Sequence, residues 1–181
     1  MDFSLSEEQR MLKDTVERLV RETYDFEKRQ KISESEEGFS REVWGQLAEL
    51  GLLGVPFPED FGGLGGGGID LMIVGEAIGQ GLVVEPYLAT VVLGGGLVEL
   101  LGSDAQKEEI LGAVVGGEKL LAFAHGEPDG RYETAHVRAT AEKIGGGWKL
   151  TGRKSVVLNG GEADTLIVSA RVSGKYDDED G

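Results

Sequence analysis

Residues 120–133 read LLAFAHGEPDGRYE, an apolar run that breaks at Glu127-Pro128 into a polar turn. Before this stretch, apolar residues recur at steps of three and four, which is typical of amphipathic helices. After it they alternate with polar residues, which is typical of strands. The stretch therefore predicts a short strand over 120–124 and marks the change from a helical to a β-structured part, with the boundary near 117–121.

Upstream of the boundary the pattern predicts five helices. Capping-box spacing at Ser4 and at Ser103 indicates two helix starts, and Pro86 indicates a third, because proline suits a first helical turn. Asp70 can cap the third helix of the series, which is apolar enough to be buried all round. The predicted helices are 6–23, 40–50, 71–79, 86–101 and 103–115.

Downstream, two alternating runs at 136–142 and 148–153 are joined by Ile144-Gly-Gly-Gly, a good hairpin connection, and a further strand is predicted over 165–172. Helices followed by strands, without βαβ alternation, indicate an α+β chain of segregated domains. We expect an all-α domain over 1–119 and a β-domain over 120–181. The last strand has no visible partner, so we expect the segment to be the front part of a longer protein.

The composition excludes several classes of function. There is no cysteine, and two isolated histidines are too few for a metal cluster. The net charge is −15 and no basic face is visible, which argues against nucleic acid as a partner. No apolar run approaches the roughly 20 residues of a membrane span, and the acidic N-terminus does not resemble a targeting peptide, so we expect a cytoplasmic protein. Cations for a phosphorylated cofactor lie mainly in the C-terminal third, at Arg131, Arg138, Lys149, Arg153 and Lys154.

Two glycine-rich stretches have structural readings. Gly63–Gly68 matches GxGxxG, but a dinucleotide site requires a strand before that motif, and Pro-Phe-Pro-Glu-Asp-Phe precedes it here. An interhelical loop is the better interpretation. Gly94-Gly95-Gly96 falls within a predicted helix and indicates close helix packing.

The turn after the 120–124 strand contains several polar candidates. His125 ends the strand, and no second imidazole or carboxylate stands at a catalytic spacing from it. Glu127 and Glu133 suggest paired carboxylates, but nothing in the sequence sets their separation. Arg131-Tyr132 can hold a phosphate and stack on a ring, or can simply form a surface turn.

In four stretches, and in the same order, the chain resembles the acyl-CoA dehydrogenases. The stretches are FSLSEEQRMLKDTVERLV, WGQLAELGLLGVPFPEDFGGLGGGGIDLMIVGEAIGQGL, LGSDAQKEEILGAVVGGEKLLAFA, and GEP followed by WKLTGRKSVVLNGG. The resemblance implies a helical N-terminal domain and the first part of an antiparallel β-barrel-like middle domain. The family's C-terminal four-helix domain is absent from this chain.

The resemblance also implies a reaction. Enzymes of this family bind FAD and desaturate acyl-CoA thioesters between Cα and Cβ, passing electrons to an electron-transfer flavoprotein. A glutamate removes the α-proton while the β-hydride goes to flavin N5. Because the family's usual base comes from its C-terminal domain, no residue of this chain is assigned as catalytic, and Glu127, Glu133 and Glu162 are not given that role.

The visible part is expected to supply the cofactor seat. The family's Thr-Glu-Pro is represented by Gly126-Glu127-Pro128, and its Trp-Ile-Thr-Asn-Gly by residues 156–160. Gly126 and Leu158 cannot donate side-chain hydrogen bonds, although backbone contacts can persist. By position, the residues expected to line the isoalloxazine, the phosphates or the pantetheine are Phe123, His125, Gly126, Arg131, Tyr132, Val156, Val157 and Leu158.

An Arg-Tyr pair after Glu-Pro resembles one branch of the family, which includes pimeloyl-CoA dehydrogenase small subunits and the heteromers of steroid degradation. Three interpretations follow. The first is an acyl-CoA dehydrogenase or its subunit, in a homo- or hetero-oligomer. The second is a non-catalytic partner subunit that keeps the fold for assembly. The third is a flavin-dependent monooxygenase of the same fold.

Overall fold

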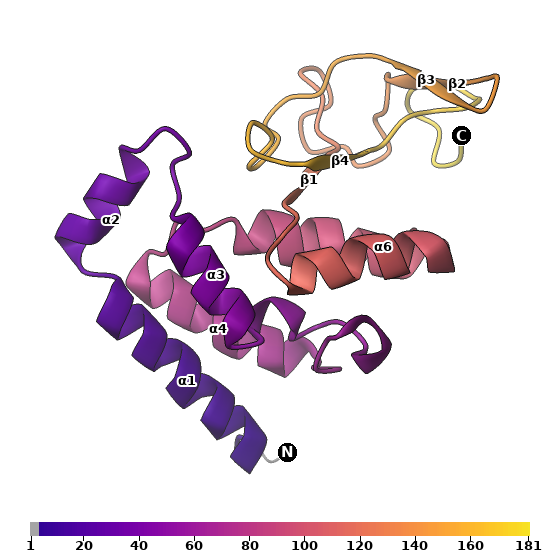
Figure 1. Ribbon diagram of the computed structural model, residues 1–181. Coiled ribbons are helices and arrows are strands. Elements are labelled where there is room, and N and C mark those ends of the chain that lie inside the picture. The colour runs from indigo at the N-terminus through magenta and orange to yellow at the C-terminus, as the bar shows by residue number, and fades with distance from the viewer. Residues whose placement is uncertain (1–3) are drawn as a thin grey trace.

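The computed structural model describes residues 4–181, so the first three residues of the predicted 1–119 domain lie outside the described part (Figure 1). Helices fill the first two thirds of the chain and short strands follow, as the sequence predicts. The α-helices are α1 (Glu7–Thr23), α2 (Phe26–Ser33), α3 (Arg41–Glu49), α4 (Gly68–Gly81), α5 (Gly96–Leu101) and α6 (Asp104–Val115).

The helices surround one hydrophobic core, and α1 packs along α4. Trp44 and Leu47 of α3, Val16 of α1 and Val74 of α4 are almost fully buried in it. Their spacing on each helix is the three- and four-residue pattern of the sequence, which places apolar side chains on one face. Two of the helices begin with a capping box, formed by Ser6 with Gln9 in α1 and by Ser103 with Gln106 in α6. The predicted box at Ser103 is confirmed, whereas the first box begins at Ser6 and not at Ser4.

Two helices differ from expectation. The α2 helix was not predicted because its sequence is polar; Asp25 begins it by accepting a hydrogen bond from the Lys28 N–H at 2.7 Å. The expectation that α4 is buried all round is wrong, since Ile69 and Met72 are 54% and 55% exposed. Asp70 lies in the first turn of α4 and accepts from the Gly67 N–H at 2.8 Å instead of capping the helix itself.

The predicted helix 86–101 is divided into a π-helix, η3 (Leu88–Gly95), and the α-helix α5. Its glycines allow close approach: a Cβ atom at Gly94 would lie 2.5 Å from the Leu121 Cβ, and one at Gly95 would overlap the Phe57 ring. The prediction of close packing is confirmed at Gly94 and Gly95, although the neighbours are a strand and an aromatic ring and not another helix, and it is wrong at Gly96, where a Cβ atom would meet nothing within 4 Å.

A buried carboxylate joins three helical segments. Glu85 is 5% exposed; it accepts hydrogen bonds from the Tyr24 hydroxyl at the end of α1 and from the Ser40 N–H, at 3.1 Å, before α3. Burial raises the pKa of Glu85, and burial together with the Glu85 carboxyl raises the pKa of Tyr24. The segment that leads into η3 is thus tied to α1 and α3.

The glycine-rich stretch after α3 is a folded loop. Two short 3-10 turns, η1 (Leu52–Gly54) and η2 (Glu59–Phe61), precede it. Backbone N–H groups of Leu64, Gly65 and Gly66 then donate to carbonyls of 54–57 at 2.8–2.9 Å. No strand precedes the GxGxxG match within the described residues, so the dinucleotide reading is excluded here and the loop interpretation is confirmed.

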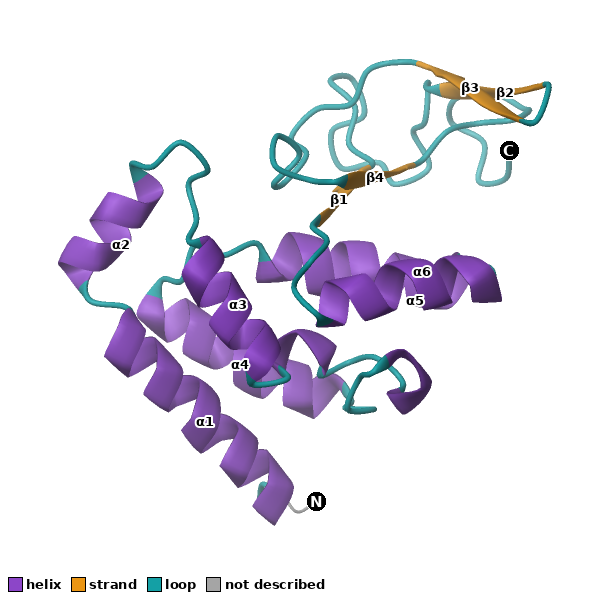
Figure 2. Cartoon of the chain, viewed as in Figure 1, coloured by secondary structure: helices purple, strands orange, loops and turns teal. Residues whose placement is uncertain are grey.

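Four short strands form two pairs (Figure 2). Strand β1 (Leu121–Ala124) pairs in parallel with β4 (Thr165–Val168), and β2 (Thr140–Ile144) forms an antiparallel hairpin with β3 (Gly147–Thr151). The predicted last strand therefore has a partner and ends at 168, not 172. Residues 136–139 are not a strand, and the described residues form no closed barrel.

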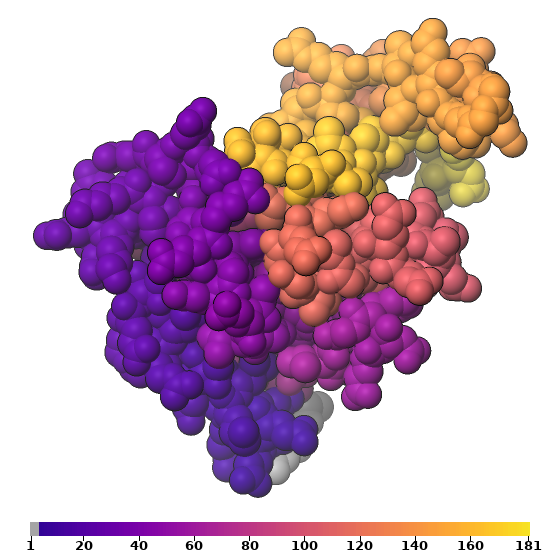
Figure 3. Space-filling view, viewed as in Figure 1, coloured from indigo at the N-terminus to yellow at the C-terminus, as the bar shows by residue number. Residues whose placement is uncertain are grey.

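The β-structured part is joined to the helices through β1. The Thr90 hydroxyl of η3 lies 3.1 Å from both the N–H and the carbonyl oxygen of Leu121, and Leu120 and Leu121 belong to the helical core. In the space-filling view, residues coloured yellow, from the last part of the chain, lie next to the salmon-coloured residues at the end of the helical part (Figure 3). The division at 119/120 stays a prediction, because one hydrophobic cluster extends across it.

Candidate functional site

Glu127 is the most constrained residue of the turn after β1. It is 8% exposed. Its two carboxylate oxygens accept hydrogen bonds from the backbone N–H groups of Arg138 and Ala139 at 2.8 and 2.9 Å. The Lys154 ammonium lies 2.8 Å from Oε1. The turn after β1 is thereby held against the segment before β2 and the segment after β3.

These partners determine the charge of Glu127. Burial by itself would raise its pKa, but the hydrogen bond from Lys154, the N–H groups of Ala139 and Arg138, and the lysine charge lower the pKa to about 2. The carboxylate is therefore ionised and fully engaged at neutral pH. It does not form a dyad with Glu133, which is exposed, and it is unsuited to act as a general base.

Lys154 connects the ends of three strands. Its ammonium donates to Glu127 Oε1, to the His125 carbonyl oxygen at 3.1 Å and to Ser169 Oγ at 3.0 Å. Ser169 Oγ lies 2.9 Å from His125 Nδ1. The Ser155 N–H donates to the Gly126 carbonyl at 2.8 Å, so two segments that contain predicted cofactor residues, 123–126 and 156–159, are neighbours. They are called the two cofactor segments below.

The first of these segments presents two stacked rings. Phe123 and His125 lie on the same side of β1, with ring centroids 5.4 Å apart and an interplanar angle of 19°. Both are partly buried, and Gly126 beyond them is exposed. A Cβ atom at Gly126 would lie 3.0 Å from the Ser155 carbonyl oxygen, so the glycine allows the two segments to approach closely.

The second segment contains two residues in the left-handed region, Val156 at φ 54° and Asn159 at φ 57°. For a β-branched valine this conformation is strained, and strain of this kind gathers at binding sites. Val156 is 91% exposed and Leu158 is 50% exposed, whereas Val157 is partly buried. The Asn159 Nδ2 atom is buried and has no hydrogen-bond partner among the described residues.

Arg131 and Tyr132 stand apart from this arrangement. They occupy an exposed turn; Arg131 has φ 49° and Tyr132 is 99% exposed. Within residues 4–181 no hydrogen bond or ion pair joins either side chain to the two cofactor segments. The structure therefore places the two segments that contain the other six predicted residues side by side and leaves this pair apart from them.

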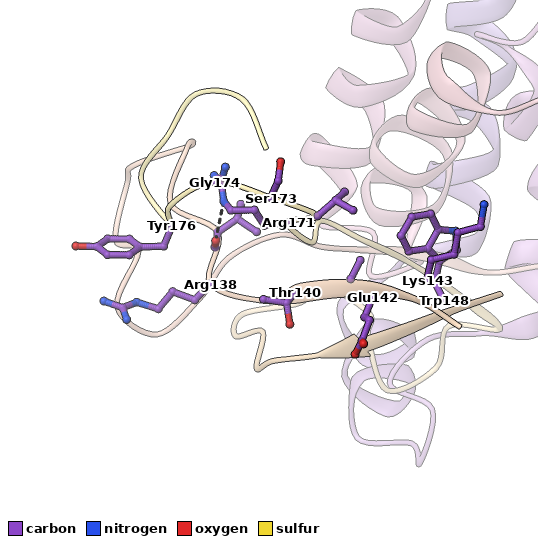
Figure 4. A pocket seen from close by; sticks show the side chains of 12 residues that line it. Arg138, Thr140, Glu142, Lys143, Trp148, Arg171, Ser173, Gly174 and Tyr176 are labelled. Carbon is purple, nitrogen blue, oxygen red and sulfur yellow. Dashed lines mark hydrogen bonds between the residues drawn. The ribbon is translucent and has the colours of Figure 1, made fainter. Parts of the chain in front are cut away.

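A groove of about 650 Å³ is lined by residues within 137–143 and 171–176 and by Trp148 (Figure 4). Arg138 and Tyr176 lie at one end, with the guanidinium carbon 4.3 Å from the ring centroid, and Lys143 and Trp148 of the hairpin lie at the other. Arg171 is 9% exposed beneath it. Its guanidinium donates to the carbonyls of Val137, Asp180, Ala135 and Asp178 at 2.8–3.2 Å.

Sequence reasoning missed Arg171 and the roles of Ser169 and Asn159. Lys154 appeared only as one of several cations in the C-terminal third. None of these roles has a local signature, because each depends on partners far away in the chain. The described residues contain no group of three side chains suited to a metal ion, and none of their helices combines the length and hydropathy that crossing a bilayer requires.

Comparison with known proteins identifies relatives of the whole chain. Residues 6–118 match the family model described as the acyl-CoA dehydrogenase N-terminal domain. The mitochondrial isovaleryl-CoA dehydrogenase of Pongo abelii is 38% identical over 170 residues, which are 92% of this chain and 40% of that protein.

Solved structures show the same likeness. Butyryl-CoA dehydrogenase from Megasphaera elsdenii superposes with a TM-score of 0.84 at 28% identity, over 96% of this chain and 46% of that one. The ChsE4–ChsE5 complex from Mycobacterium tuberculosis gives a TM-score of 0.84 at 30% identity, over 95% and 46% of the two chains. The chain thus spans less than half the length of these relatives.

Proposed function

The chain belongs to the acyl-CoA dehydrogenase family, and on that premise we propose that it contributes the FAD seat for the α,β-desaturation of an acyl-CoA thioester. The observation that carries this proposal is the pairing of the two cofactor segments. Lys154, Glu127 and the Ser155–Gly126 backbone hydrogen bond hold 123–126 beside 156–159. A site assembled in this way from the end of β1 and the loop between β3 and β4 is pre-organised before a ligand arrives.

The residues present suit a flavin. The stacked rings of Phe123 and His125 offer a flat, partly buried surface, and exposed backbone at Gly126 and Val156 can meet the polar edge of a ring. The buried Nδ2 of Asn159 lacks an acceptor, and a carbonyl or ring nitrogen of the cofactor would supply one. When bound, FAD would supply the hydride acceptor for the reaction.

The chain's own residues then have limited roles. Segments 123–126 and 156–159 bind and orient the cofactor, while Lys154 and Glu127 hold the two segments next to each other. No described residue is proposed as the base that removes the α-proton, because Glu127 is held ionised by three donors. An acyl-CoA substrate, an electron-transfer flavoprotein, an oligomeric assembly and a cytoplasmic location belong to the proposal.

The test is to purify the protein and titrate it with FAD, following the visible spectrum and flavin fluorescence, and then to assay acyl-CoA desaturation with an artificial electron acceptor. We expect stoichiometric binding that weakens about tenfold in Asn159→Ala, the equivalent of one hydrogen bond. The control is Lys143→Ala, which removes a cation from the separate groove and should leave the affinity unchanged. Failure of FAD to bind, alone or with a related subunit, would overturn the proposal.

A second function is favoured by a specific observation. Gly126 and Leu158 carry no hydroxyl where the family has one, which suits a non-catalytic partner subunit that keeps the fold for assembly. One structural relative is itself a complex of two different chains. Co-expression with a related subunit separates the two functions: full flavin content and desaturation by this protein alone would exclude the partner role.

A further inference from the structure

The hydrogen bonds around Lys154 bear on which nitrogen of His125 carries the proton. An ammonium group has three hydrogens, and Lys154 Nζ has three acceptors within 3.1 Å: Glu127 Oε1, the His125 carbonyl and Ser169 Oγ. All three hydrogens are used. Ser169 Oγ is consequently an acceptor toward Lys154.

Ser169 Oγ accepts from Lys154 with one lone pair, which leaves its hydroxyl hydrogen available for an acceptor of its own. Among the described residues, His125 Nδ1 is the acceptor within reach, at 2.9 Å. If the hydroxyl donates to Nδ1, that nitrogen is unprotonated, and the neutral imidazole carries its proton on Nε2. Nε2 has no hydrogen-bond partner within residues 4–181.

We propose that His125 presents its Nε2–H as a hydrogen-bond donor to an acceptor atom of the isoalloxazine, in place of the hydroxyl that Gly126 lacks. The inference rests on the proposed function, because it places the flavin beside β1. Ser169 and Lys154 are positioning residues: they select the tautomer of His125 and hold the ring against Phe123. The donor is thereby moved from position 126 to position 125.

The tautomer can be tested without any cofactor. The chain contains only two histidines, His125 and His136, so a ¹⁵N-labelled sample gives two imidazole spin systems. In alkaline buffer, where an imidazole is neutral, a long-range ¹H–¹⁵N correlation spectrum should show His125 with a protonated Nε2 and an unprotonated Nδ1. His136, assigned by its loss in His136→Phe, is the reference. A protonated Nδ1 at His125 would overturn the proposal.

The same spectrum of Ser169→Ala tests the positioning role. Without the hydroxyl, Nδ1 loses its donor, so the His125 signals should move toward a mixture of both tautomers. An unchanged His125 spectrum would show that Ser169 does not select the tautomer. Because this variant keeps Phe123 and Lys154 in place, circular dichroism should match that of the wild type.

The donor role is tested by FAD titration of variants. His125→Phe keeps a flat ring but has no N–H and should weaken FAD binding about tenfold, as expected for one lost hydrogen bond. In His125→Gln the amide N–H takes the place of Nε2–H, and the affinity should stay within about threefold of the wild type. The matched control His136→Phe should bind as the wild type does.

The outcomes separate the two proposals. If the wild type binds no FAD but shows the Nε2–H tautomer, the proposed function fails, whereas the selection of the tautomer by Ser169 and Lys154 stands. If the wild type binds FAD and His125→Phe binds it equally well, the donor role of His125 is excluded and the proposed function stands.

Discussion

Lys154 and Glu127 lie 27 positions apart in the chain and form a buried ion pair, with side chains 10% and 3% exposed. A buried pair is not strongly stabilising in itself, because removing both charges from water is costly. Here every hydrogen of the ammonium and both carboxylate oxygens have partners, so the pair specifies which turns meet. Loss of one partner would leave the other charge buried and uncompensated.

The unfolding free energy should depend on pH through the ionisation of Glu127 in this pair. The folded-state pKa of Glu127 is lowered from 4.5 to about 2. Its stabilising contribution is therefore fully present above pH 4.5 and is lost as the pH falls toward 2. Across that window the wild type should lose up to about 3 kcal/mol of unfolding free energy more than Glu127→Gln does. Urea unfolding at a series of pH values measures the difference.

Glu133→Gln is the matched control, since it removes an exposed carboxylate from the same turn. Its stability should follow the wild-type pH dependence. Parallel curves for the wild type and Glu127→Gln between pH 4.5 and 2 would show that the Lys154–Glu127 pair does not hold the turn in solution.

At the scale of elements, the π-helix η3 and its glycines place the helical part against β1. Gly94 faces Leu121, and Gly95 faces the Phe57 ring, which is fully buried. Helix propensity alone would disfavour three glycines in a row. The sequence keeps them because a side chain at either of the first two positions would force the strand or the ring away.

Adjacent glycines of this segment make a matched pair of variants. Gly95→Ala introduces a Cβ that overlaps Phe57 and should lower the unfolding free energy by about 1–3 kcal/mol. Gly96→Ala meets nothing within 4 Å and should be neutral or stabilise by up to about 1 kcal/mol, because alanine favours a helix. Thermal or urea unfolding of both gives the comparison. Equal effects would mean that Gly95 is not tightly packed in solution.

At the scale of the whole molecule, a single hydrophobic cluster joins the two parts of the chain. Leu120 and Leu121 pack with core residues from the helices, and Ile167 of β4 lies against the same cluster. Thr90 is fully buried at this junction and satisfies both backbone groups of Leu121 with one hydroxyl. We infer that β1 unfolds together with the helical core.

Thr90→Val tests this junction because it keeps the shape of the side chain and removes the hydroxyl. Two backbone groups of Leu121 would be left buried without partners, at a cost of roughly 2–4 kcal/mol. The measurement is urea unfolding followed by fluorescence of Trp44, in a Trp148→Phe background. Thr140→Val, on the exposed face of β2, is the control and should change stability by less than about 0.5 kcal/mol. A similar small change in Thr90→Val would contradict the role of this junction.

Much of the local structure was predictable because its causes lie within a few residues. The serine caps, the apolar spacing of α1, α3 and α6, and the hairpin around the glycines after Ile144 all have signals of that range. The π-helix was predicted as part of an ordinary helix. Its glycines pack against Leu121 and Phe57, which are distant in the chain, and the local sequence does not show those contacts. The polar α2 has little apolar pattern and was missed.

The sequence by itself determined the change from helices to strands at 120–124 and the membership of the acyl-CoA dehydrogenase family, and it predicted the two segments that form the candidate site. Only the tertiary structure decided the parallel pairing of β1 with β4, the Lys154–Glu127 pair and the contact of His125 with Ser169. Periodicity and capping are local properties that single residues and their near neighbours express. A parallel strand pair, a buried ion pair and a long-range side-chain hydrogen bond depend on partners from distant segments, which come together only when the chain packs.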